Sequence, residues 1–90
     1  MPTTRVQIIN KLGLHARAAA KFVGVASRYG CQVKIGQNEQ SQVDGKSIMQ
    51  VMMLAASKGS EVSITCEGEQ AEQAMEELLA LINDYFGEGE

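Results

Sequence analysis

The 90-residue sequence predicts an α+β fold in which three helices cover one face of a four-stranded antiparallel sheet. The main observation is the order of hydrophobic periodicities along the chain, which reads β-α-β-β-α-β-α. A second observation is that each helical segment has one apolar stripe and each strand one apolar face. Two packed layers bury all of these surfaces at once. We therefore expect residues 1–90 to form a single domain, an open-faced β-sandwich.

The first half of the chain supplies three strands and one helix. Residues 5–9 are a short run of β-type residues and predict the first strand. Residues 16–27 are rich in alanine, with apolar side chains at helical spacing, and Gly30 is a suitable cap after them. Residues 31–35 alternate between apolar and polar, and residues 40–43 form a weaker run beyond a polar turn. These two runs predict a hairpin.

The second half supplies two helices and one strand. A shorter helix is predicted over residues 46–55, and residues 62–66 alternate as a strand does. Residues 70–86 carry the clearest apolar stripe, and Gly87 follows them. On the face of the sheet opposite the helices we expect solvated polar side chains, namely Gln7, Gln32, Lys34, Ser63 and Thr65.

Composition excludes several classes of protein. The longest apolar run, residues 51–56, is too short for a membrane span, and the start of the chain lacks an apolar signal segment. We therefore predict a cytoplasmic protein without membrane insertion. One histidine, two cysteines and no Cys-x-x-Cys motif predict no metal and no cofactor.

The charges are distributed unevenly. Residues 1–66 carry eight bases and three acids, a net charge of +5, whereas residues 67–90 carry eight acids and no base, a net charge of −8. Such asymmetry indicates one face for a charged partner and another that maintains solubility. A surplus of five charges over 66 residues is small for a nucleic-acid groove, so we predict no nucleic-acid partner. We expect the protein to be a monomer.

His15 and Arg17 form the candidate reactive group. His15 lies between a glycine-containing loop and the first turn of a predicted helix, where backbone N–H groups without intrahelical partners attract anions. The positive end of that helix disfavours an imidazolium, so we expect a neutral and nucleophilic ring. Arg17 is close enough in sequence to bind phosphoryl oxygens beside the ring. A histidine at a helix start also occurs as a simple cap or surface residue.

Two motifs resemble one known family. Residues 13–17, Gly-Leu-His-Ala-Arg, and residues 45–52, Gly-Lys-Ser-Ile-Met-Gln-Val-Met, resemble HPr, the histidine-containing phosphocarrier of the bacterial phosphoenolpyruvate-dependent phosphotransferase system, and its nitrogen-system paralogue NPr. The resemblance extends over essentially the whole chain in length and element order. It implies the HPr-like form of the fold predicted above. It leaves open whether the pathway serves sugar uptake or nitrogen regulation.

The resemblance also implies roles for single residues. His15 would accept a phosphoryl group on Nδ1 from phosphorylated Enzyme I and pass it to an IIA protein, with Arg17 stabilising the transferred group. The protein would thus be a phosphoryl carrier, not an enzyme. Ser47 matches the serine that an HPr kinase/phosphorylase modifies in some bacteria, although a serine at a helix start is also an ordinary N-cap. The family usually has proline where this chain has Ala18, which loses some rigidity but restores an N–H group near the phosphate.

Several residues are candidates for partner binding. The resemblance places the apolar side chains of the second helix on the surface beside His15, where adaptable methionines suit more than one partner. We assign Met53 and Leu54 to the core instead. The predicted partner surface consists of Leu14, Lys21, Lys46, Ile48, Met49 and Met52.

Two other functions remain open from sequence. A purely regulatory HPr-like binding protein would act through Ser47 and not through His15. A small acylphosphatase-like hydrolase could use a similar sandwich, but it would have to clear an acyl phosphate by itself. The chain contains no paired carboxylates and no Gly-rich nucleotide loop for such independent catalysis.

Overall fold

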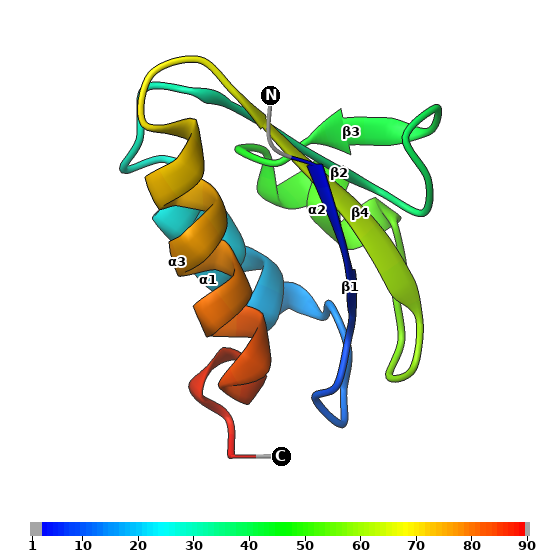
Figure 1. Ribbon diagram of the computed structural model, residues 1–90. Helices are drawn as coiled ribbons and strands as arrows, with labels where there is room; N and C mark the ends of the chain where they lie inside the picture. The colour runs from blue at the N-terminus through cyan, green and yellow to red at the C-terminus, as the bar shows by residue number, and fades with distance from the viewer. Residues whose placement is uncertain (1–2, 90) are drawn as a thin grey trace.

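The computed structural model describes residues 3–89, and within them it shows the predicted two-layer architecture (Figure 1). The strands are β1 (Thr3–Gln7), β2 (Gln32–Gly36), β3 (Gln42–Asp44) and β4 (Glu61–Glu67). The helices are α1 (Ala16–Ala26), α2 (Ile48–Met53) and α3 (Ala71–Asn83), followed by a short 3₁₀ turn, η1 (Tyr85–Gly87).

The strands form one antiparallel sheet in the order β1-β4-β2-β3. β4 lies between β1 and β2, with Val6 opposite Val62 and Val33 opposite Cys66. α1 and α3 lie side by side over the sheet, and α2 packs against α1 and β3 (Figure 1). The prediction of an open-faced β-sandwich with a four-stranded antiparallel sheet and three helices is therefore confirmed.

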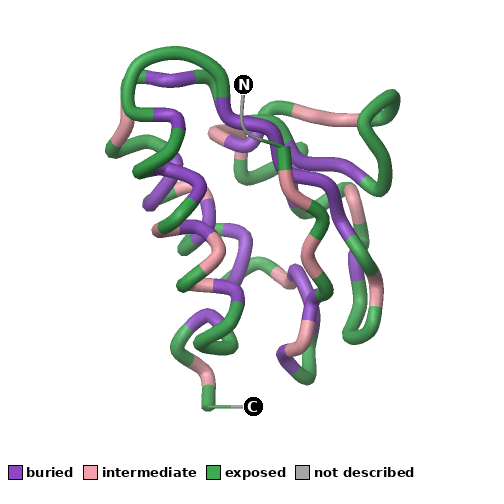
Figure 2. The backbone as a smooth tube through the Cα atoms, in the orientation of Figure 1, coloured by how far each residue is buried: buried purple, intermediate pink, exposed green. Residues whose placement is uncertain are grey.

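The core lies between the helices and the sheet. Phe22 of α1, Leu78 of α3, and Ile35 and Ile64 of the sheet are all fully buried in one hydrophobic cluster. Each such side chain contributes roughly 1.5–3 kcal/mol by leaving water. Figure 2 shows buried positions recurring along α1 and α3 and along most of the central strand β4. This packing fixes the position at which α1 begins, and hence the position of His15.

The outer face of the sheet differs in part from the prediction. Gln7, Gln32 and Lys34 are exposed as expected, but Ser63 is fully buried and Thr65 is only 8% exposed. Both residues lie on β4, which has a strand on each side. The Gln42 amide also extends across this face, donating to the Ser63 carbonyl at 3.2 Å and to Thr65 Oγ1 at 3.0 Å. Neighbouring side chains thus remove these two residues from water.

Three expectations about the helices are also corrected. The last helix ends at Asn83, three residues before the predicted end, because Tyr85 and Phe86 adopt positive φ angles of 56° and 54°. The second helix spans only residues 48–53, and Ala55 ends its last turn with a φ of 51°. Met53, which we expected in the core, is 77% exposed, whereas Leu54 is partly buried against the core.

The two cysteines face the core, as their strand alternation predicts. Both thiols are free and buried, and burial, followed by the neighbouring Cys31, raises the pKa of Cys66 to about 11. Because a thiolate is the reactive form, we expect both residues to react slowly with a thiol reagent in the native protein and rapidly after denaturation. Rapid labelling of native protein, followed by mass spectrometry, would show that the strand alternation is wrong.

Two further features can be stated for residues 3–89. None of the helices in this part of the chain has the length and apolarity that crossing a bilayer requires. The same residues contain no cluster of three or more histidine, cysteine or acidic side chains arranged to bind a metal ion.

Candidate functional site

A tight loop before α1 sets the position of His15. Gly13 has a φ of +69°, and a Cβ atom there would lie 2.4 Å from the carbonyl oxygen of Ala56. Glycine allows this approach, so the next residue, Leu14, donates its N–H to the same carbonyl at 2.8 Å. Leu14 then turns its side chain into the core and anchors the loop. His15 follows directly at the start of α1.

His15 is the N-cap residue of α1, but its ring does not cap the helix. Its backbone is extended, with φ −78° and ψ −179°, and its side chain makes no capping hydrogen bond. The side chain is 28% exposed. The N–H groups of the first helical turn are therefore available to an anion beside the ring, at the positive end of the helix dipole. Ala18, in this turn, is fully buried, and it retains the N–H group that the usual proline lacks.

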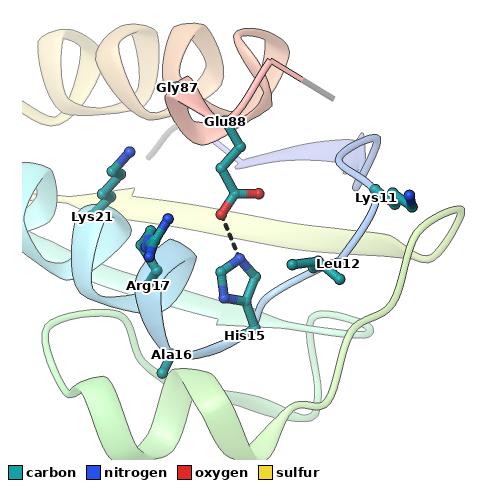
Figure 3. Close-up of a pocket in the computed structure, with 8 residues that line it drawn as sticks. All are labelled: Lys11, Leu12, His15, Ala16, Arg17, Lys21, Gly87 and Glu88. Atoms are coloured by element: carbon teal, nitrogen blue, oxygen red, sulfur yellow. Dashed lines mark hydrogen bonds and ion pairs between the residues drawn. The ribbon is translucent and has the colours of Figure 1, made fainter.

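A surface pocket surrounds the ring, as Figure 3 shows. Three cationic residues line it: Lys11, Arg17 and Lys21. Arg17 is exposed, and within residues 3–89 its guanidinium makes no hydrogen bond or ion pair. Arg17 extends from the first turn of α1 and lines the same pocket as the ring (Figure 3). The structure thus places three of the predicted site residues, His15, Arg17 and Lys21, around one pocket.

The Nε2 side of the ring contacts the carboxylate of Glu88, which the sequence pattern does not predict as a site residue. His15 Nε2 is hydrogen-bonded to Glu88 Oε2, and Asn10 Nδ2 donates to Glu88 Oε1 at 3.0 Å. Burial raises the pKa of Glu88, but the hydrogen bonds from Asn10 and His15, together with the positive charge of Lys21, outweigh this effect. The pKa of Glu88 is therefore below its usual value. Glu88 is a carboxylate at neutral pH.

The C-terminal segment is held against α1 by further contacts. Phe86 is fully buried, and its carbonyl accepts a hydrogen bond from Lys21 Nζ at 2.6 Å. Asn10 is also fully buried, and its Nδ2 donates to the Gly13 carbonyl at 2.9 Å. One amide therefore connects the loop before His15 with the segment after α3.

The predicted partner surface is present only in part. Ile48, Met49 and Met52 are exposed on α2, with Met49 70% exposed. Leu14 is only 4% exposed and belongs to the core, so the expectation that it joins this surface is wrong. Leu12, in contrast, is 67% exposed and lines the His15 pocket.

Lys46 and Ser47 lie before α2. Lys46 lines a different pocket from that of His15, and its Nζ donates to the Tyr29 carbonyl at 2.7 Å. Ser47 is the N-cap of α2, and its hydroxyl accepts the Gln50 N–H at 3.3 Å. The predicted cap is therefore confirmed.

Sequence reasoning missed Asn10 and Glu88. The sequence pattern assigns no role to Asn10, and Glu88 is only one of the eight acids of residues 67–90. Gly87 was the available signal, because a glycine with a φ of +75° allows the chain to return toward α1. Periodicity could not show which element Glu88 would reach.

The chemistry available here is nucleophilic attack by one ring nitrogen. Because a carboxylate oxygen only accepts hydrogen bonds, Nε2 carries the hydrogen and Nδ1 has the free lone pair in the neutral ring. In Figure 3, Nδ1 points away from Glu88, toward the start of α1 and the side of Arg17. An electrophilic phosphorus at Nδ1 would lie among donors for its oxygens.

Comparisons with known proteins identify the family. The family model described as "PTS HPr component phosphorylation site" matches residues 2–84. Phosphocarrier protein HPr of Pseudomonas aeruginosa is 63% identical over 90 residues, which cover both chains completely, and phosphocarrier protein NPr of Escherichia coli is 32% identical over 92% of each. The crystal structure of HPr from Thermoanaerobacter tengcongensis has a TM-score of 0.91 at 41% identity, covering 98% of each chain. The fold, the histidine-centred pocket and these similarities show that the chain belongs to the HPr family of the phosphotransferase system.

Proposed function

We propose that the protein accepts a phosphoryl group from phosphorylated Enzyme I on Nδ1 of His15 and passes it to an IIA protein. The observation that carries this proposal is the orientation of the ring at the start of α1. Nε2 is occupied by Glu88, whereas Nδ1 faces the first helical turn and the side of Arg17 (Figure 3). The 63% identity to an HPr, against 32% to an NPr, supports HPr-type partners in the cytoplasm.

The transfer is a single displacement at phosphorus. The Nδ1 lone pair forms the new nitrogen–phosphorus bond while the bond between phosphorus and the donor residue of Enzyme I breaks. Arg17 and the N–H groups of the first turn stabilise the phosphoryl oxygens. Transfer to the IIA protein is the same displacement with His15 as the leaving group, so the carrier returns unchanged.

The apolar surface of α2 is the proposed docking surface for these partners. Ile48, Met49 and Met52 are exposed on one short helix, and unbranched methionines adapt to surfaces of different shape. Met53 extends this surface, because it is exposed instead of buried. Lys21 adds positive charge at the pocket, which favours encounter with acidic partners.

Ser47 is the proposed regulatory site. Its hydroxyl group is at the start of α2, immediately before the docking surface, where an HPr kinase/phosphorylase would modify it. A phosphate there adds nearly two negative charges beside apolar side chains that must lose water on docking. Regulation would therefore act on recognition and leave the fold intact.

The test is incubation of the protein with phosphoenolpyruvate and Enzyme I, with the intact mass measured over time. We expect a mass increase of one phosphoryl group, labile in acid and stable in alkali, as a phosphohistidine is. The His15→Ala variant, which lacks the proposed acceptor, is the negative control. An acid-stable label, or an equal label on this control, would contradict the proposal. Turnover of an acyl phosphate by the protein alone would instead indicate the hydrolase alternative.

A further inference from the structure

We infer that Glu88 is a positioning residue for His15. Its carboxylate accepts a hydrogen bond from Nε2–H of His15 and thereby orients the ring so that Nδ1 faces the phosphoryl site. This inference rests on the phosphoryl carrier function proposed above and adds a residue to its site. The contact on which it depends joins the N-cap of α1 to the segment after α3, 73 positions apart in sequence.

The carboxylate is itself held by a second hydrogen bond, and its backbone segment is held by a third. Asn10 holds the Oε1 atom of Glu88 at 3.0 Å and is anchored through the Gly13 carbonyl at 2.9 Å. Lys21 holds the Phe86 carbonyl at 2.6 Å, two residues before Glu88. Because Asn10 and Phe86 are fully buried, both supports are connected to the core.

The hydrogen bond acts on the ring in two ways. It selects the tautomer with the hydrogen on Nε2, which leaves the Nδ1 lone pair free. It also prevents the ring from turning over and exchanging the positions of its two nitrogens. A carboxylate on the distal nitrogen stabilises the positive charge that forms when Nδ1 bonds to phosphorus, as in triads in which a carboxylate orients a histidine.

The charged groups around Glu88 are consistent with this role. The hydrogen bonds from Asn10 and His15, and after them the charge of Lys21 on α1, keep the pKa of Glu88 below its usual value in spite of burial, and Lys11 and Arg17 line the same pocket. The carboxylate is therefore ionised and lies on the opposite side of the ring from Nδ1 (Figure 3). It is thus placed to accept the ring hydrogen without occupying the phosphoryl site.

The experiment compares wild type, Glu88→Ala, Glu88→Gln and the charge-matched control Glu39→Ala, which removes an exposed acid from the β2–β3 turn. The first measurement is made on unphosphorylated, nitrogen-15-labelled protein by NMR. We expect a hydrogen-bonded imidazole Nε2–H resonance, protected from exchange, in wild type and Glu39→Ala. We expect Glu88→Ala to lose it and Glu88→Gln to keep it, since the amide oxygen still accepts the bond.

The second measurement is the rate of phosphoryl transfer from Enzyme I. We expect Glu88→Ala to lower the maximal rate about tenfold with little change in KM, as loss of an orienting partner does. Glu88→Gln should recover most of this loss. An absent Nε2–H resonance in wild type, or an unchanged or faster rate in Glu88→Ala, would overturn the inference. If the wild type instead failed to accept a phosphoryl group, the proposed function would be refuted. The NMR measurement would still show whether the hydrogen bond between His15 Nε2 and Glu88 exists.

Discussion

Replacing Arg17 with alanine is expected to slow phosphoryl transfer from Enzyme I to His15 by about one to two orders of magnitude. The guanidinium lines the His15 pocket and, within the described residues, has no protein partner to release before it binds phosphoryl oxygens. A charge-assisted contact of this kind is worth about 1.5–3 kcal/mol, and each factor of ten in rate corresponds to about 1.4 kcal/mol.

The fold should be almost insensitive to the same change. Arg17 is exposed, and exposed substitutions usually alter stability by about 0.5 kcal/mol or less. Arg28→Ala is the matched control, because it removes the same charge at the far end of α1, where Arg28 pairs with Glu77. Equal transfer rates for the two variants, measured in a rapid-quench assay, would show that Arg17 does not stabilise the transferred group.

Replacing Ser47 with aspartate is expected to raise KM for Enzyme I about tenfold, which corresponds to about 1.4 kcal/mol of lost binding. The new carboxylate lies beside Ile48, Met49 and Met52, and it must lose water when this surface docks. The maximal rate should change little, because Ser47 does not line the His15 pocket. The melting temperature should hold, because aspartate is also a good N-cap.

Two further variants separate capping from recognition. Ser47→Ala removes the hydroxyl that accepts the Gln50 N–H, so it should cost about 1 kcal/mol of stability while transfer remains normal. Ser41→Asp adds the same charge to the exposed turn before β3 and should leave KM unchanged. A normal KM for Ser47→Asp would restrict Ser47 to its capping role.

The sequence alone predicted the elements whose signals are local. The alternation of Val62, Ile64 and Cys66 marked β4, and the stripe containing Phe22 marked α1; both are confirmed, with small shifts at the ends. His15 was placed correctly at a helix start because a glycine-containing loop precedes an alanine-rich segment. These features depend on neighbours only a few positions away.

The features that were missed depend on residues far apart in sequence. Ser63 and Thr65 alternate as solvent-facing residues do, but the central position of β4 buries them. Leu14 turns inward because Gly13 passes close to Ala56, and nothing near Leu14 in the sequence indicates that approach.

The contact between Glu88 and His15 also depends on residues far apart in sequence. It depends on left-handed backbone at Tyr85 and Phe86, residues with no particular preference for that conformation. The buried side chain of Phe86 compensates for the local strain. The carboxylate therefore reaches His15 through tertiary packing, which a helical pattern continued to residue 86 would not predict.

The most direct test of the account is the position of the phosphorus atom on the phosphorylated protein. Nitrogen-15-labelled protein, phosphorylated by Enzyme I, can be analysed by NMR for coupling between phosphorus and each imidazole nitrogen of His15. We expect coupling to Nδ1, with Nε2 still carrying its hydrogen toward Glu88. A phosphorus atom on Nε2, or on any residue other than His15, would contradict this expectation.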